Sequence, residues 1–241
     1  TVGAGLVQIY TASENRLALQ ELLPEAIISC YDSYDDSQLS HLLDWADVVC
    51  IGCGLGMGQI SEKILKNVLK NVSCPCVIDA DGLNLLNGKI ELLNQCRAPV
   101  ILTPHMKEMS RLTGWSIDKI MEDRFHALDQ IIKQSGPDTK SSIICVLKDS
   151  RTVVAQTNRQ KFVNLAGNNS MAKGGSGDVL AGTIAGLLAQ HMAPFEAAAV
   201  GVFLHACGGD EAKKSKGSYS VLARDLIQGM ADAMKNAKEC R

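Results

Sequence analysis

The stretch GNNSMAKGGSGDVLAGTIAGLLAQ, residues 167–190, is the most informative part of the chain. Its glycines permit a tight turn in which several backbone N–H groups point the same way, and a helix rich in Ala, Gly and Leu follows. The N-terminus of such a helix offers unpaired N–H groups and the positive end of the helix dipole, which suits a phosphate. The residues expected to form this anion hole are Gly174, Gly175, Ser176 and Gly177.

Asp178 follows the glycines in the first turn of the expected helix, and two interpretations remain open for it. It either caps the helix N-terminus, a common role for Asp after Gly, or acts as a catalytic base beside a phosphoryl group. A carboxylate next to an anion site is electrostatically unfavourable, so its presence there favours catalysis. The loop is not a Walker motif, because no Gly-Lys-Ser/Thr follows its glycines. It is not a Rossmann fingerprint either, because it lies late in the chain and follows no first strand.

The composition excludes two classes of protein. The chain has 241 residues, of which 46% are hydrophobic, enough for a buried core. No apolar run approaches the roughly 20 residues of a membrane span, which excludes an integral membrane protein. The net charge of −2 and the aromatic content of 4% argue against a nucleic-acid-binding protein, which would need a basic face and stacking side chains.

Strand-like and helix-like segments alternate along the chain, with no linker or repeat between them. The expected strands are residues 5–11, 47–52, 76–81, 100–104 and 142–148, followed by a hairpin of residues 152–157 and 161–165 across Asn158 and Arg159. The expected helices are residues 14–23, 61–71, 117–136 (which Gly136 and Pro137 end), 177–190, 194–214 and 221–238. The alternation predicts one α/β domain over residues 1–241, with a mainly parallel central sheet in a three-layer α/β/α arrangement. Ligands are expected at the carboxyl ends of its strands.

Two glycines and one histidine in the expected late helices have structural interpretations. Gly182 and Gly186 each weaken a helix relative to Ala, so their expected purpose is close packing against a neighbouring element. His205 is flanked by apolar residues and is expected to be a hydrogen-bonded packing residue rather than a ligand.

Nine cysteines are present, an odd number in a chain that is too long and core-rich to need disulfides. Cys50 and Cys53 form a CxxC, and Cys74 and Cys76 form a CxC. Both motifs lie at the ends of apolar runs, without a second CxxC or a paired His at zinc-site spacing. We therefore expect reduced, half-buried core thiols, no protein-only metal site, and a reducing, cytoplasmic location.

Six segments occur in order along the chain: IGCGLG, VIDADGLNLL, LTPHMKEMSRLTG, VLKDSRTVVA, GNNSMAKGGSGDVLAGTIAGLLAQ and FLHACGGDEA. Their combination resembles the NAD(P)H-hydrate dehydratase family, also called the YjeF carboxy-terminal domain, of the ribokinase-like superfamily. The resemblance covers essentially the whole chain and implies a ribokinase-like fold. It also implies repair of nicotinamide cofactors hydrated at ring carbon six, with consumption of ADP or ATP. Members usually begin with a further strand that nothing here matches, so the domain is expected to lack its first strand.

The resemblance also assigns roles to particular residues. It implies that Asp178 is the catalytic base, and that the hydrate is bound by Gly54, His105 and Asp178. An ordinary turn glycine is the alternative for Gly54, and a surface or capping group is the alternative for His105. It implies a nucleotide-binding segment made of Lys148, Asp149, Ser150, Arg151, Thr152 and Gly177, although solvated charges leading into a hairpin are the alternative for the first five. Asp81 and Asn84 either contact ligand or magnesium, or make an Asx turn and a helix cap.

The expected co-substrate is ADP or ATP with Mg²⁺, and ADP is preferred. With ADP, the products of S-form NADHX or NADPHX repair are NADH or NADPH, AMP and phosphate. No nucleic acid or membrane partner is expected, whereas the resemblance favours a homo-oligomer, most simply a tetramer, and a fused or separate epimerase. Two alternatives stay open: a ribokinase-like kinase acting on a thiazole, pyrimidine or sugar alcohol, and a non-catalytic nucleotide-binding sensor.

Overall fold

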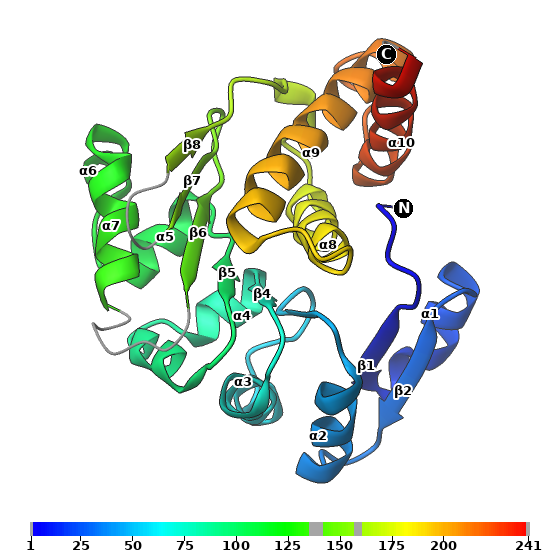
Figure 1. Cartoon of the computed structure of the whole chain (residues 1–241), viewed down its shortest axis with the longest axis vertical. Helices are drawn as coiled ribbons and strands as arrows, with labels where there is room; N and C mark the ends of the chain where they lie inside the picture. Colours follow the sequence, from blue (N-terminus) through cyan, green and yellow to red (C-terminus); the bar gives the residue numbers. More distant parts are fainter. Residues whose placement is uncertain (1, 135–141, 157–160, 240–241) are drawn as a thin grey trace.

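The structure, a computed structural model, describes residues 2–134, 142–156 and 161–239 (Figure 1). The strands are β1 (Gln8–Ala12), β2 (Ile27–Tyr31), β3 (Val49–Ile51), β4 (Cys76–Ile78), β5 (Val100–Leu102), β6 (Ile143–Leu147), β7 (Val153–Gln156) and β8 (Lys161–Val163). The α-helices are α1 (Arg16–Leu22), α2 (Asp36–Trp45), α3 (Gln59–Asn71), α4 (Ala80–Leu85), α5 (Met106–Thr113), α6 (Ile117–Glu122), α7 (Arg124–Gln134), α8 (Ser176–Leu188), α9 (Pro194–Lys216) and α10 (Ala223–Glu239). Short 3-10 helices are η1 (Ser13–Asn15), η2 (Ile90–Gln95) and η3 (Asn169–Met171).

The main sheet has the strand order β3-β4-β5-β6-β7-β8. Strands β3 to β6 pair in parallel, with Cys76 of β4 opposite Val49 of β3 and Val100 of β5. Strands β7 and β8 add an antiparallel edge. The prediction of a mainly parallel sheet is confirmed, as are the two strands of the hairpin, whose turn across Asn158 and Arg159 lies outside the described residues.

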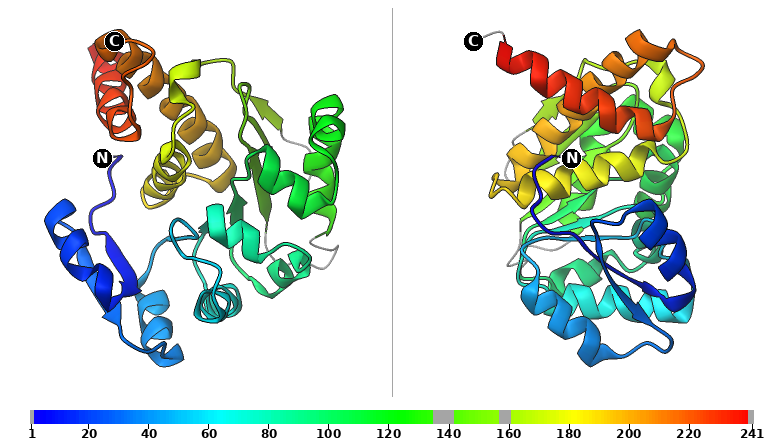
Figure 2. Two further views of the ribbon diagram at one scale, coloured as in Figure 1. Left: turned by 180° about the vertical axis from the view of Figure 1, so that it is seen from behind. Right: turned by 90° about the vertical axis from the view of Figure 1, so that its right-hand side faces the viewer.

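Alternate residues of the central strands face opposite layers of helices. In β4, Cys76 and Ile78 belong to a core that also contains residues of α3, α5 and α7. Val77 between them packs in a second core with α8 and α9. Figure 2 shows these helices on the two sides of the sheet. The predicted three-layer α/β/α arrangement is therefore confirmed, and it explains why the central strands are continuously apolar.

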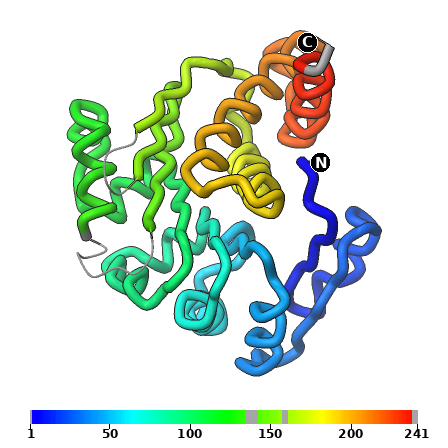
Figure 3. The backbone as a smooth tube through the Cα atoms, in the orientation of Figure 1, coloured from blue at the N-terminus to red at the C-terminus, as the bar shows by residue number. Residues whose placement is uncertain are grey.

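Strands β1 and β2 form a separate two-stranded parallel sheet, which lies beside the main sheet in Figures 1 and 3. The sequence predicts the first strand, although three residues too early, but does not predict β2 or α2. No residue from 3 to 38 is buried, so this region carries none of the buried apolar runs that reveal the central strands. Before β1 the chain runs to α8, where Val2 is buried against Gly186. The absence of the family's first strand stays a prediction.

The expected helix 117–136 is divided in the structure into α6 and α7. The break falls at Asp123, which has φ −143° and ψ 82°, and its carboxylate accepts the backbone N–H of His126 at 2.9 Å. The expected stop at Gly136 and Pro137 lies outside the described residues. The three late helices are confirmed as α8, α9 and α10. Among the described residues, no helix is both long enough and apolar enough to cross a membrane.

Candidate functional site

The glycine loop leads into α8 through a left-handed residue. Gly175 is the N-cap of α8 and has φ +84°, a conformation that favours glycine, and no side chain caps this helix end. The first N–H groups of a helix have no partner within it, so this end of α8 is available for an anion. The capping interpretation of Asp178 is wrong, because Asp178 is the third residue of α8 and its carboxylate makes no cap hydrogen bond.

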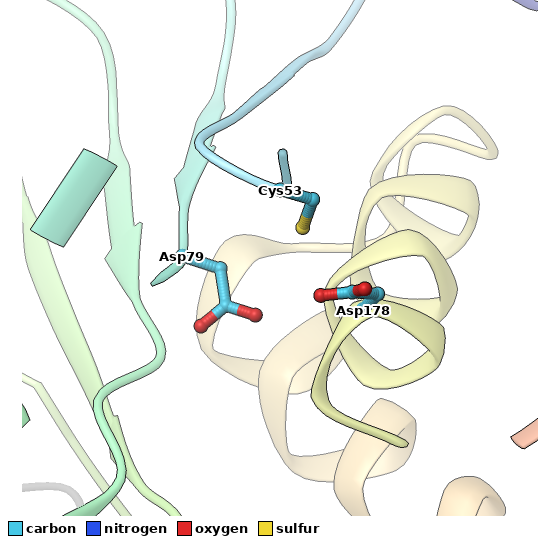
Figure 4. Close-up of side chains that lie close together, drawn as sticks. All are labelled: Cys53, Asp79 and Asp178. Carbon is cyan, nitrogen blue, oxygen red and sulfur yellow. The ribbon is translucent and has the colours of Figure 1, made fainter. Parts of the chain in front are cut away.

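Asp178 faces a second carboxylate and a thiol across the end of the sheet. Figure 4 shows its carboxylate pointing toward Asp79, which directly follows β4, with the sulfur of Cys53 above both. One carboxylate oxygen from each Asp and the Sγ of Cys53 lie within 4.8 Å of one another. Asp178 is exposed, whereas Asp79 is only 1% exposed. The arrangement places an accessible carboxylate beside a buried one.

Lys148 supplies the positive charge of this site. It directly follows β6, and its Nζ lies 2.6 Å from Oδ1 of Asp79 and 4.0 Å from Oε2 of Glu108. A Cβ built on Gly177 would come within 3.1 Å of this Nζ, so glycine in the first turn of α8 leaves room for the ammonium group. The lysine therefore brings together the ends of β4 and β6 and the N-terminal end of α8.

His105 is held by a capping box at the start of α5. The Nδ1 of the His105 ring accepts hydrogen bonds from the backbone N–H groups of Lys107 and Glu108 at 3.1 and 3.2 Å. The backbone N–H of His105 donates to the Glu108 carboxylate at 2.8 Å, which completes the capping box. Because Nδ1 is an acceptor, the proton of the neutral ring is on Nε2. The His105 side chain is 48% exposed, and its Nε2 lies 3.4 Å from Oε1 of Glu108. An isolated parallel β-bridge pairs the backbones of His105 and Lys148, which follow the adjacent strands β5 and β6.

The loop after β3 is bound tightly to the loop after β4. Gly52 has φ +120°, and a Cβ there would overlap the carbonyl oxygen of Asp79, so only glycine fits. Gly54 has φ +68°, is exposed, and has open space around its Cα, which allows a ligand to approach closely. The Oδ2 of Asp81 accepts the backbone N–H of Gly56 at 2.8 Å and so fixes the far end of this loop.

Neither Asp81 nor Asn84 caps a helix, which was the structural alternative to binding a ligand or magnesium. Both lie inside α4, whose N-cap is Asp79, and no side chain caps that helix. Asn84 accepts a hydrogen bond of 2.7 Å from Arg111 of α5, so its Oδ1 braces two helices. Their predicted contacts with ligand or magnesium stay predictions, and Asp81 and Asn84 already have these protein partners.

Of the residues expected to bind the nucleotide, only Lys148 and Gly177 lie at the start of α8. Asp149 forms a 2.9 Å ion pair with Arg124 of α7, the helix layer on the opposite side of the sheet from α8. Thr152 donates to the carbonyl oxygen of Asp149 at 3.1 Å, and Ser150 and Arg151 are exposed in the turn before β7. For these four residues the geometry resembles the alternative, solvated groups leading into a hairpin.

Two residues of α9 support the glycine loop from behind. The Nε2 of His205 lies 3.3 Å from the hydroxyl of Ser176, and burial lowers the pKa of this histidine to about 4. His205 is thus the hydrogen-bonded packing residue that the sequence predicts. Asp210 accepts hydrogen bonds from the Asn168 amide at 2.7 Å and from the backbone N–H of Gly167 at 3.3 Å. The start of the loop is therefore fastened to α9.

The CxxC cysteines differ from expectation. Cys50 and Cys53 are exposed, because they lie at the free edge and the end of β3 rather than in a core. Cys74 is half-buried and Cys76 is buried, as expected. Although the residue as a whole is exposed, hydrogen bonding with Cys50, desolvation of the sulfur and the nearby carboxylates of Asp178 and Asp79 together raise the pKa of the Cys53 thiol.

Asp79, Glu108 and Cys53 complete the site but were not among the residues expected to form it. The signal for Asp79 is its place as the first polar residue after a buried strand. Glu108 is 5% exposed, unusual for a carboxylate, but sequence alone does not show that burial. Two cavities of about 340 and 1160 Å³ lie elsewhere, beside Trp115 on one side and between α2 and α3 on the other, and share no residue with this site.

Comparison with known proteins gives one consistent family. Residues 1–231 match the family model described as NAD(P)H-hydrate dehydratase. The ADP-dependent (S)-NAD(P)H-hydrate dehydratase of Neisseria meningitidis is 35% identical over 222 residues, which cover 90% of this chain and 73% of that protein. The bifunctional NAD(P)H-hydrate repair enzyme Nnr of Escherichia coli is 38% identical over 225 residues, covering 93% of this chain and 41% of that protein. The chain spans 35–44% of the length of the bifunctional relatives it matches.

Solved structures agree with this result. A hypothetical protein of Streptococcus mutans superposes with a TM-score of 0.81 at 33% identity, covering 98% of this chain and 81% of that one. The ADP/ATP-dependent NAD(P)H-hydrate dehydratase of Bacillus subtilis, co-crystallised with ATP and Mg²⁺, has a TM-score of 0.78 at 26% identity, covering 98% and 82%. Hydroxyethylthiazole kinase of Pyrococcus horikoshii, at 14% identity and a TM-score of 0.67, shows the shared ribokinase-like fold alone. The chain belongs to the NAD(P)H-hydrate dehydratase family.

Proposed function

We propose that this protein dehydrates the S-form of NADHX or NADPHX back to NADH or NADPH at the expense of ADP or ATP. The observation that carries the proposal is the position of Asp178. An exposed carboxylate lies in the uncapped first turn of α8, with one oxygen within 4.8 Å of an Asp79 oxygen, and Asp79 is paired with Lys148. A base, an anion-binding helix end and a cation thus meet at one point, which is the set of groups that phosphoryl transfer needs.

The chemistry of the substrate explains why a kinase-like site would perform a dehydration. The hydrate carries a hydroxyl on a ring carbon beside the nitrogen, and hydroxide is a poor leaving group. In the proposed reaction the hydroxyl oxygen attacks the terminal phosphorus of the nucleotide while Asp178 accepts the hydroxyl proton. The phosphate ester formed is a good leaving group. The ring nitrogen's lone pair then expels phosphate, and loss of a ring proton restores the reduced nicotinamide.

The start of α8 is the proposed seat of the transferred phosphoryl group. Backbone N–H groups of Gly174, Gly175 and Gly177 stabilise the charge that develops on the phosphoryl oxygens, and the helix dipole adds to this effect. The N–H of Ser176 instead donates to the carbonyl oxygen of Lys173 at 3.2 Å. The Lys148 ammonium lies beside Gly177, at the same end of the helix. Its ion pair with buried Asp79 keeps the ammonium in place before the nucleotide binds.

Mg²⁺ fits the donors of this site. The carboxylate oxygens of Asp79 and Asp178 are hard ligands near enough to each other to share one cation, whereas the Cys53 sulfur is not a ligand that Mg²⁺ prefers. When bound with the nucleotide, Mg²⁺ neutralises phosphate charge. His105 and Gly54 are proposed to contact the hydrate, since both are exposed at neighbouring strand ends.

ADP is the proposed co-substrate, which gives AMP and phosphate as the other products. Support comes from the N. meningitidis relative, whose name specifies ADP, while the B. subtilis enzyme is named for both nucleotides. We further propose a homo-oligomer, a reducing cytoplasmic location, and action beside a fused or separate epimerase. Fusion of two activities in the longer bifunctional relatives supports the epimerase.

One assay tests the proposed function against its alternatives. The protein is mixed with hydrated NADH and Mg²⁺, and with ADP or ATP in separate reactions, while the absorbance of the reduced ring and the release of inorganic phosphate are followed. The proposal predicts one NADH and one phosphate for each nucleotide consumed, faster with ADP. A phosphorylated product that accumulates on an alcohol substrate would establish the kinase instead, and nucleotide binding without turnover of the hydrate would establish the sensor.

A further inference from the structure

Glu108 is a buried carboxylate beside the groups of the proposed reaction. It is the third residue of α5 and is 5% exposed, although a carboxylate is rarely buried unless it is paired. Its capping-box hydrogen bond with the N–H of His105 does not account for a charge at this position. Glutamine serves there as well as glutamate, so the capping box needs only an oxygen. The charge of Glu108 therefore calls for another partner.

The order of the strands brings Glu108 to the side chain of Lys148. Lys148 follows β6 and pairs with Asp79, which follows β4, and β5 lies between those two strands. The contact between Lys148 and Asp79 therefore crosses the end of β5, over two strand spacings or about 10 Å. Glu108 belongs to the helix that follows β5, and its Oε2 lies 4.0 Å from the Nζ of Lys148. It thus lies beside the ammonium group at this crossing.

Two buried carboxylates consequently share one ammonium group. Asp79 is 1% exposed and Glu108 is 5% exposed, and an oxygen of each lies within 4.0 Å of the Lys148 Nζ. A buried carboxylate is costly unless a cation or a hydrogen-bond donor faces it. Lysine also has a long, flexible side chain, so attraction to two fixed carboxylates restrains its ammonium group more than attraction to one.

We propose that Glu108 is a positioning residue, whose charge holds the Lys148 ammonium group beside Gly177 for the transferred phosphoryl group. The effect on turnover rests on the proposed function, but the attraction between Glu108 and Lys148 does not. Glu108 acts on the reaction through Lys148, so its loss should slow phosphoryl transfer. It should not weaken nucleotide binding, because removing a negative charge does not repel an anion.

Glu108→Gln tests this role, because it removes the charge but keeps an oxygen that can accept the His105 N–H. We expect kcat for the hydrate to fall about tenfold, with no rise in the KM for ADP. A displacement of about 1 Å can cost roughly a hundredfold, and Asp79 still holds part of the lysine's position. In a Lys148→Met background the same substitution should lower kcat by less than about threefold, because the group through which it acts is gone.

Asp35→Asn is the matched control, since it also neutralises a carboxylate at the start of a helix. Asp35 is exposed at the N-cap of α2, where it accepts the backbone N–H of Ser37 at 2.9 Å. Asparagine caps helices as well as aspartate does. Neither kcat nor the KM for ADP should change in this variant.

Urea unfolding of the parent chain, the two single variants and the double variant measures the attraction itself, without any ligand. With Lys148 present, Glu108→Gln removes an attraction, whereas in the Lys148→Met background it removes one of two buried carboxylates that no ammonium group separates. The substitution should therefore favour the folded state more in the Lys148→Met background, by about tenfold or more in the unfolding equilibrium constant. The capping box contributes equally in both backgrounds and cancels.

Each contrary result is distinct. Equal effects of Glu108→Gln on unfolding in the two backgrounds would overturn the inferred attraction, whatever the protein catalyses. An unchanged kcat, a raised KM for ADP, or an equal fall in kcat in both backgrounds would overturn the positioning role. If the parent chain does not turn over the hydrate, the proposed function fails, while the unfolding measurements still decide whether Glu108 holds Lys148.

Discussion

Lys148 combines two roles at the scale of one residue, and removing it should affect stability and activity together. Lys148→Met leaves Asp79, 1% exposed, without its 2.6 Å partner. Stranding a buried charge in this way should lower the free energy of unfolding by about 3 kcal/mol. Loss of the ammonium beside Gly177 should lower kcat/KM by about a hundredfold.

Urea unfolding and steady-state rates check this prediction, with Lys161→Met as the matched control. Lys161 pairs with Asp129 at 3.0 Å on the surface, where an ion pair contributes at most about 1 kcal/mol. Equal losses of stability in the two variants would show that the Lys148–Asp79 pair is no more important than a surface contact.

His205 should make stability depend on pH. Because its pKa in the folded chain is about 4, below the ordinary 6.5, the unfolded chain takes up a proton that the folded chain does not. Stability should therefore be full above about pH 6.5 and fall as the pH drops toward 4, by about 3 kcal/mol in total.

His205→Gln keeps a hydrogen-bonding partner for Ser176 but cannot titrate. The difference in unfolding free energy between parent and variant, measured from about pH 7 down to about pH 5, should shift steadily in favour of the variant. A difference that is constant across this range would show that His205 charges equally well in both states.

At the scale of elements, α9 and α10 cross at a pair of glycines. A Cβ on Gly229 of α10 would overlap the carbonyl oxygen of Gly208 in α9, so the two helices must separate if it is added. Gly229→Ala should therefore destabilise the protein by about 2 kcal/mol or more in thermal or urea unfolding.

Gly182→Ala is the control for this prediction, because a Cβ on this exposed residue of α8 would meet nothing within 4 Å. It should stabilise the protein by up to about 1 kcal/mol, the helix preference of Ala over Gly. The same sign of effect in both variants would contradict the account of the α9–α10 crossing. The close-packing prediction is thus wrong for Gly182, whereas Gly186 does pack against Val2.

The success of prediction from sequence differed between elements for a physical reason. The central strands of the main sheet are buried on both faces, so β6 appears in the sequence as a run of five apolar residues, a pattern typical of a fully buried strand. β2 has no buried residue and its signal is correspondingly weak. The division between α6 and α7 depends on the backbone of Asp123, which a periodic apolar pattern does not reveal.

At the scale of the whole molecule, burial is unevenly distributed, and backbone protection should follow it. Strand β6 is buried at all five positions, whereas no residue from 3 to 38 is buried. In native-state hydrogen exchange, amides of β4, β5 and β6 should exchange through global unfolding, while those of β1 and β2 exchange earlier through local opening. Protection of β1 equal to that of β6 would contradict this account.

The candidate site shows what a sequence pattern can and cannot reveal. The glycine loop and the Asp that follows it are contiguous in sequence, so their pattern predicts a tight turn leading into a helix, which the structure has at Gly175 and α8. Asp79 and Lys148 follow β4 and β6, and Glu108 lies in α5 after β5, so their contact is a property of the sheet order rather than of spacing. The family resemblance predicts Asp149 at the site together with Lys148, but its ion pair with Arg124 holds it toward the other helix layer, which adjacency in sequence does not reveal.

The central claim is that Asp178 takes a proton while a phosphoryl group is transferred at the start of α8. The most direct measurement compares Asp178→Asn with the parent chain for the single-turnover rate of NADH formation from its hydrate, at saturating ADP and Mg²⁺, with unfolding free energies determined in parallel. We predict a rate reduced by about a hundredfold or more, with ADP still bound and stability within about 1 kcal/mol of the parent. An undiminished rate in the folded variant would contradict the claim.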